Sequence, residues 1–162
     1  MKISRLGSPR HFLFVLVLMS CQSGTGARSH AAPDPVQSLN DGTVASVLER
    51  IKGREREPAG TVFKNVRLKN LQNVPAEQFL DIMSYGYARA LGVTCSHCHE
   101  VSDFASDDKR PKRAAREMAL MHFGINQQLL RMENLETMPP EKRFINCGTC
   151  HHGSIIPGRK NQ

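Results

Sequence analysis

Four of the five cysteines form two copies of one short motif. Each copy has two cysteines three positions apart with a histidine directly after the second, and the six residues are Cys95, Cys98, His99, Cys147, Cys150 and His151. Cysteines at i and i+3 lie one helical turn apart, and a histidine at i+4 projects nearby. This C-x-x-C-H pattern is the attachment signature of c-type haem, in which the histidine is the proximal iron ligand. The sequence therefore predicts two covalently bound haem c groups.

Three other roles fit a C-x-x-C pair, and each explains less of the pattern. A thioredoxin-like redox pair expects a strand–helix–strand context, which neither neighbourhood offers. Zinc could bind four cysteines, or two cysteines and two histidines, but four thiolates leave the histidine after each pair unexplained. Local disulfides would close very small, strained loops.

The composition is lean in apolar residues. The chain has 162 residues, 40% of them hydrophobic and none of them Trp, whereas about 45–50% is usual for a globular domain. Two buried macrocycles would supply the missing apolar surface. The longest apolar run has eight residues, Phe12 to Met19, and a membrane-spanning helix needs about 20. We expect an all-α fold, a small dihaem cytochrome c built from two helix-plus-CxxCH units, without a membrane-spanning helix.

The N-terminus predicts export and lipidation. Basic residues precede the apolar run, and Ser20 and Cys21 follow it, which is typical of a signal peptide over residues 1–20. The tetrad that ends at Cys21 resembles the lipobox of bacterial lipoproteins, in which the cysteine is acylated. We therefore expect lipidation at Cys21 and a periplasm-facing protein anchored by lipid to a bacterial membrane, although an ordinary secretory signal cleaved further on is the alternative.

A tether is expected between the anchor and the haem domain. Residues 22 to about 40 are rich in Ser, Gly, Ala, Pro and Gln, which favours a flexible linker. Asp41 could cap a short helix that ends at Gly53. We expect residues 21–60 to hold the lipidated cysteine and this tether, and residues 61–162 to form the dihaem cytochrome c domain.

A helix with a methionine precedes the first motif. It is expected to begin near Pro75 and to stop at Gly92, and its apolar stripe includes Met83, 12 residues before Cys95. A thioether at this place can cover the distal face of the first haem, so Met83 is the candidate sixth ligand. The alternative is ordinary stripe packing.

A second helix is expected from Pro111 to about Arg131. It offers Met118, Met121 and His122 as candidates for the sixth ligand of the second haem, so a bis-histidine iron stays open here. The charged loop from Ser102 to Arg110 is interpreted as a solvated connection.

These features together resemble a known family. The order is a methionine helix, Leu-Gly-Val-Thr-Cys-x-x-Cys-His, a charged loop, Arg-x-Met-x-x-Met, and Cys-Gly-Thr-Cys-His-His-Gly. It resembles the cytochrome c subunit of photosynthetic reaction centres over about residues 62–157, and most of all small dihaem members from non-photosynthetic bacteria. The resemblance implies Met83 as sixth ligand of the first haem and Met118 as that of the second. The chain departs from the pattern at His152, where the family usually has Arg, and it lacks a tetrahaem repeat.

The expected function is electron transfer without enzymatic chemistry. An iron with His and Met ligands has no open position, so it exchanges electrons without binding substrate. Partners would be redox proteins, including a membrane-bound electron-transfer complex, and basic clusters would either dock them or be solvated surface. Nucleic acid is not expected outside the cytoplasm. A peroxidase, reductase or haem-based sensor with one five-coordinate iron is the alternative, with His122 or His152 as an acid–base group.

Overall fold

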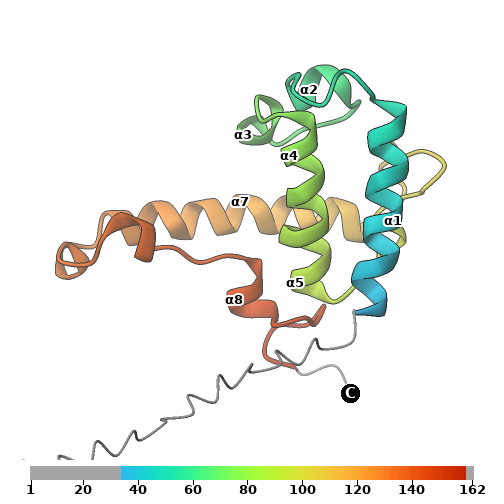
Figure 1. Ribbon diagram of the computed structural model, residues 1–162. Coiled ribbons are helices and arrows are strands. Elements are labelled where there is room, and N and C mark those ends of the chain that lie inside the picture. Colours follow the sequence, from blue (N-terminus) through green and yellow to red (C-terminus); the bar gives the residue numbers. More distant parts are fainter. Residues whose placement is uncertain (1–33, 160–162) are drawn as a thin grey trace, which may run out of the picture. The chain divides into compact units, whose positions relative to one another are not determined.

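The computed structural model describes residues 34–159. The predicted signal peptide, the predicted lipidation site Cys21 and most of the predicted tether lie outside these residues. The described chain forms helices and loops, with isolated bridges between Pro58 and Pro75 and between Glu100 and Asp103 in place of a sheet (Figure 1). The all-α prediction is confirmed.

The helices differ greatly in length. In chain order they are α1 Pro35–Arg50, α2 Ala59–Val62, α3 Lys69–Gln72, α4 Ala76–Asp81, η1 Ile82–Ala88, α5 Arg89–Leu91, α6 Cys95–Cys98, α7 Arg110–Leu130, η2 Glu133–Leu135, η3 Pro140–Lys142 and α8 Cys147–His151. The CxxCH motifs account for α6 and α8, each about one turn long.

The methionine helix before the first motif forms as predicted. Pro75 precedes its first residue, and α4, η1 and α5 follow without a break until Gly92, which adopts a left-handed conformation with φ 67°. Gly tolerates this conformation better than other residues, so it ends the helix. The middle segment η1 is a π-helix, which the sequence pattern did not indicate.

The second predicted helix is also confirmed. α7 runs for 21 residues, with Pro111 in its first turn, where the missing N–H costs nothing. In Figure 1 it runs across the directions of α1 and of the α4–α5 helix. It packs against α6, the turn that carries the first pair of cysteines.

The N-terminal helix is longer than predicted. α1 begins at Pro35, not at Asp41, because Asp34 caps it by accepting a hydrogen bond from the Val36 N–H at 2.9 Å and Pro35 fits the first turn. Residues 35–40 are therefore helical rather than part of a flexible tether. α1 also packs against η1, next to the first motif.

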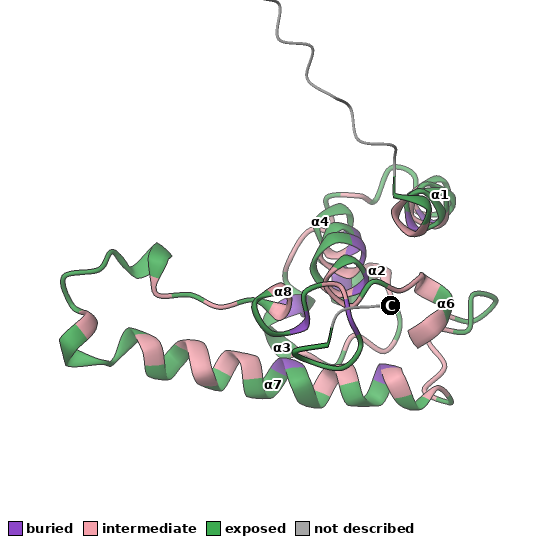
Figure 2. Ribbon diagram, turned by 90° about the horizontal axis from the view of Figure 1, so that it is seen from below, coloured by how far each residue is buried: buried purple, intermediate pink, exposed green. Residues whose placement is uncertain are grey.

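The hydrophobic core is small. Figure 2 shows few buried positions, scattered over several helices. Those that are hydrophobic are Val47, Leu71, Leu80, Ala59, Ala76, Ala88 and Ala119, mostly short side chains. No helix among residues 34–159 is long and apolar enough to cross a membrane.

A buried asparagine ties α1 to the first motif. Asn40 is 1% exposed. Its Oδ1 accepts a hydrogen bond from the Cys95 backbone N–H at 2.9 Å, and its Nδ2 donates to the Val93 carbonyl at 3.0 Å. The Cys95 thiol also donates to this Oδ1 at 3.3 Å. One side chain thus satisfies backbone groups on both sides of the turn that enters α6.

We expect Asn40→Ala to lower the free energy of unfolding by about 2–4 kcal/mol, because it leaves buried backbone groups of residues 93 and 95 without partners. Guanidinium unfolding of the purified protein, followed by far-UV circular dichroism, measures the change. Asn70→Ala, on the exposed surface of α3, is the matched control and should change it by about 0.5 kcal/mol or less. Equal effects of the two variants would contradict the structural role of Asn40.

Candidate haem-attachment sites

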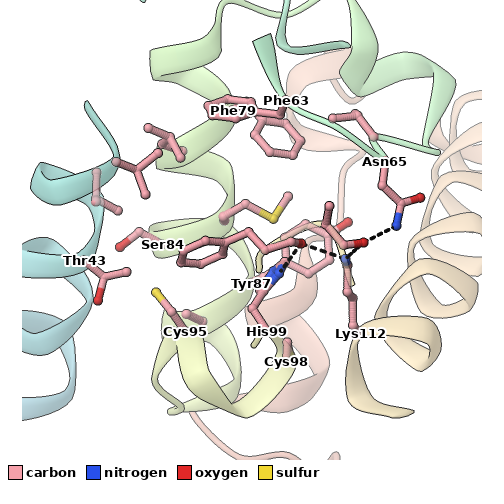
Figure 3. A pocket seen from close by; sticks show the side chains of 18 of the residues that line it. Thr43, Phe63, Asn65, Phe79, Ser84, Tyr87, Cys95, Cys98, His99 and Lys112 are labelled. Carbon is pink, nitrogen blue, oxygen red and sulfur yellow. Dashed lines mark hydrogen bonds between the residues drawn. The ribbon is translucent and has the colours of Figure 1, made fainter. Parts of the chain in front are cut away.

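The first CxxCH motif opens onto a cavity of about 390 Å³, within the range of about 300–1,000 Å³ that is usual for ligand pockets. α1, the methionine helix and the start of α7 contribute to its walls. In Figure 3, Cys95, Cys98 and His99 lie toward one end, and Phe63 and Phe79 lie toward the other. The lining is mainly apolar, as an insoluble macrocycle requires.

The predicted residues of the first site come together here. Met83 projects from η1 into the lining of the cavity that Cys95, Cys98 and His99 also line. π-helical segments occur often at functional sites. Met83 therefore shares a cavity with its proposed haem, while its bond to iron stays a prediction.

The ring of His99 is fixed from behind. Its Nδ1 lies 3.2 Å from the Phe104 carbonyl oxygen, which can only accept, so Nδ1 is the protonated nitrogen. Burial lowers the pKa of His99, the Phe104 hydrogen bond raises it, and nearby Lys112 lowers it again. The net effect lowers the pKa of His99, which favours the neutral imidazole, and the hydrogen bond at Nδ1 leaves Nε2 for a metal.

The loop behind His99 is an ordered charge network. The interpretation of residues 102–110 as a solvated connection is wrong for its central part, because Asp107 forms ion pairs with Arg116 at 2.8 Å, Arg67 at 2.9 Å and Lys112 at 3.3 Å. Asn65 also donates to Asp107 at 2.9 Å. Sequence spacing could not reveal this network, because residues 65 and 67 belong to a loop that is far from Asp107 in the sequence.

The second motif has the same arrangement of its histidine. His151 is buried in α8, and its Nδ1 lies 2.9 Å from the Ser154 carbonyl oxygen. Asn146 caps α8 by accepting a hydrogen bond from the Thr149 N–H. α8 packs on α5 and η1, and the Gly153 N–H donates to the Ala90 carbonyl at 2.9 Å. Both CxxCH histidines thus leave Nε2 for a metal.

The approach to the second motif is held by α7. Asn126 accepts from the Ile145 N–H at 2.9 Å and donates to the Ile145 carbonyl at 3.0 Å. The Nε2 of His122 lies 2.7 Å from that same carbonyl oxygen. In this arrangement His122 anchors the chain before Cys147, so its Nε2 is not directed to a metal.

The two methionine candidates for the second site lie at the surface. Met118 is 40% exposed and Met121 is 50% exposed on α7. Phe144, Ile155 and Ile156, which flank the second motif, are exposed as well. The structure does not enclose Met118 with His151 as it encloses Met83 with His99, and the role of Met118 stays a prediction.

The alternatives for the cysteines find little support. Cys95, Cys98, Cys147 and Cys150 are all free thiols in this structure. Within residues 34–159, no three His, Cys, Asp or Glu side chains gather as a ligand set for a metal ion. The four-thiolate zinc site would need such a set.

Comparison with known proteins gives one family. The profile of the photosynthetic reaction centre cytochrome C subunit matches residues 16–160. Cytochrome c-554 of Chloroflexus aurantiacus is 30% identical over 55% of this chain, and the photosynthetic reaction center cytochrome c subunit of Rubrivivax gelatinosus is 30% identical over 67% of it. The matched regions span only 20% and 30% of those proteins. No solved structure gives a significant match.

The charge network predicts an acid-sensitive stability. Burial works to raise the pKa of Asp107, but hydrogen bonds from Arg116 and Lys112 outweigh it and lower the pKa from 3.8 to about 2. Because the folded pKa is depressed, the stabilisation is complete above about pH 4 and is lost as the pH falls toward about 2. We expect Asp107→Asn to be less stable than the unmodified protein above about pH 5, and this difference to shrink between about pH 4 and pH 2.

Urea unfolding of both proteins across this pH range measures the difference. Asp108→Asn is the control, because Asp108 is exposed and accepts a hydrogen bond from the neighbouring Ser106 hydroxyl. If Asp107→Asn lowers the free energy of unfolding by the same amount from about pH 6 to pH 2, the stability does not depend on the protonation of Asp107 and the prediction is wrong.

Proposed function

Because the chain belongs to the photosynthetic reaction centre cytochrome c subunit family, we propose that it is a dihaem c-type cytochrome that relays electrons. The observation that carries the proposal is the shared state of the two CxxCH histidines. His99 and His151 each turn Nδ1 to a backbone carbonyl, at 3.2 Å and 2.9 Å. Such a bond fixes the ring and makes the other nitrogen a better metal ligand.

The first haem would be held by four residues around the cavity. Cys95 and Cys98 would form the thioethers, His99 would be the proximal ligand and Met83 the distal ligand. The apolar walls and the α1 helix would keep water from this site, which supports electron exchange over ligand binding.

The second haem would be held on α8. Cys147 and Cys150 would form the thioethers and His151 would be the proximal ligand. Met118 is the proposed distal ligand, by resemblance to the family. The exposed apolar side chains near α8 offer surface that a macrocycle would cover.

A haem iron with six ligands supplies one-electron exchange and has no open position for substrate. The protein contributes fixed ligands and a low-dielectric surround, and we assign it no catalytic residue. This favours a carrier over a peroxidase, reductase or sensor.

We further propose that the protein acts at a membrane. A lipid on Cys21 would anchor it on the periplasm-facing side, with redox proteins as partners. The Rubrivivax relative is by name a reaction center subunit, so a membrane-bound electron-transfer complex is the proposed class of partner here. Basic residues such as Lys64, Arg67 and Lys109 would favour a partner with an acidic surface at the docking site.

Haem counting tests the proposal directly. The full chain, exported to a periplasm with c-type maturation, should contain two haems by the pyridine haemochrome assay, and both should survive acid–acetone extraction. We expect one haem in Cys95→Ala/Cys98→Ala and one in Cys147→Ala/Cys150→Ala. Absence of haem from the unmodified protein, or zinc in its place, would refute the dihaem assignment.

The distal ligand of the first haem is tested by carbon monoxide. The reduced protein should not bind carbon monoxide while Met83 occupies the iron, whereas Met83→Ala should bind it at one haem and show a lower reduction potential. Visible absorption spectra detect the carbon monoxide complex, and a potentiometric titration followed by the same spectra measures the reduction potential. Met132→Ala removes an exposed methionine (47% exposed) and is the matched control.

Rapid carbon monoxide binding by the unmodified protein would instead indicate a five-coordinate iron and favour the enzyme or sensor. Applied to the Cys95→Ala/Cys98→Ala protein, the same assay identifies the second ligand. Met118→Ala should open that iron, and Met121→Ala and His122→Ala should not.

A further inference from the structure

One lysine is buried in a strongly basic chain. Lys112 is 8% exposed, although it lies in the first turn of α7 among other charged residues. Its Nζ donates to the carbonyl oxygens of Phe104 at 2.8 Å, Ala105 at 3.1 Å and Ser106 at 2.6 Å. The loop after the first motif therefore wraps around a single ammonium group.

One of these carbonyls also holds the proximal histidine. The Phe104 oxygen that accepts from Lys112 is the oxygen that lies 3.2 Å from Nδ1 of His99 (Figure 3). The ammonium and the imidazole are thus bonded to the same atom. Two donors on one carbonyl compete for its electron density, so each weakens the bond of the other.

The surrounding charges do not cancel the lysine. Asp107 is the carboxylate that pairs with Lys112, at 3.3 Å, but it also pairs with Arg116 at 2.8 Å and Arg67 at 2.9 Å. Three cations therefore share one carboxylate. The network behind His99 carries an excess of positive charge.

We propose that Lys112 is a positioning residue that raises the reduction potential of the first haem by acting on His99 through the Phe104 carbonyl. This inference rests on the proposed function, because it requires a haem on Cys95 and Cys98.

Two effects of Lys112 have the same sign. Reduction adds one electron from a donor to the iron and breaks no bond, so the site becomes less positive by one charge, which a nearby cation favours. By weakening the His99 hydrogen bond, Lys112 also makes the imidazole a poorer donor to the oxidised iron. Both effects favour the reduced state.

Potentiometric titration with redox mediators tests the proposal. In Lys112→Met, which keeps an apolar stem, we expect the equilibrium constant for reduction of the first haem to fall about tenfold, a shift of about 59 mV for one electron. The equilibrium constant for reduction of the second haem should change by less than about twofold, so the second haem is an internal control. Lys112→Arg keeps the charge and should restore most of the potential.

A lysine on exposed α3 gives the matched control. Lys69→Met removes the same charge away from the Phe104 carbonyl and should change either constant by less than about twofold. An unchanged reduction potential of the first haem in Lys112→Met, or an equal change in the potentials of both haems, would overturn the proposal. The Cys147→Ala/Cys150→Ala background assigns the potential to the first haem.

A second variant keeps the test valid if Lys112→Met fails to fold. Asp107→Asn removes the one carboxylate of the network, so it should shift the first haem in the opposite direction, to a higher potential. A lower potential in Asp107→Asn would overturn the proposal. A protein without two haems contradicts the proposed function, whereas two haems with unmoved potentials contradict only the role of Lys112.

Discussion

An imidazole presents one nitrogen to a metal in a defined direction only when its other nitrogen is held. In this protein the holding groups are backbone carbonyls that follow each motif, those of Phe104 and Ser154. A carbonyl can be aimed only by fixing the loop that carries it. The first loop is fixed by Lys112 and Asp107, and the second by its turn against the end of the methionine helix. Lys112, Asp107 and the methionine helix therefore position the two histidines through these loops.

The larger apolar side chains of the interior line the cavity at the first motif rather than packing against one another in a core. Few hydrophobic residues are fully buried, and most of those are alanines, while larger ones such as Phe79, Met83 and Tyr87 line the cavity. Such a domain buries little apolar area by itself, so its stability from the hydrophobic effect is modest. A covalently attached macrocycle would complete this interior. Polar contacts such as the hydrogen bonds of Asn40 fix the helices and turns that line the cavity.

The local features were predictable from the sequence, and the distant contacts were not. The CxxCH turns, the helix that ends at Gly92 and the long helix after Lys109 each depend on signals within a few residues. Asn40 looked like part of a tether, because nothing near it shows that Val93 and Cys95 need its amide. By sequence, Lys112 is one cation of a basic cluster that would either dock a partner or be solvated surface. Its burial depends on three carbonyls of a neighbouring loop, and the sequence pattern does not show that they converge on it.

The two motifs have the same spacing but different surroundings, and the methionine helix connects them. Its η1 segment lines the first cavity, and α5 at its end packs on α8. Tyr87 belongs to both regions, since it lines that cavity while burial, and then the nearby Cys147, raise its pKa to about 12. A helix that contacts both sites keeps them at a fixed separation. The first site is enclosed and the second has exposed methionines, so two pentapeptides with the same CxxCH pattern have different environments, and these can set different potentials.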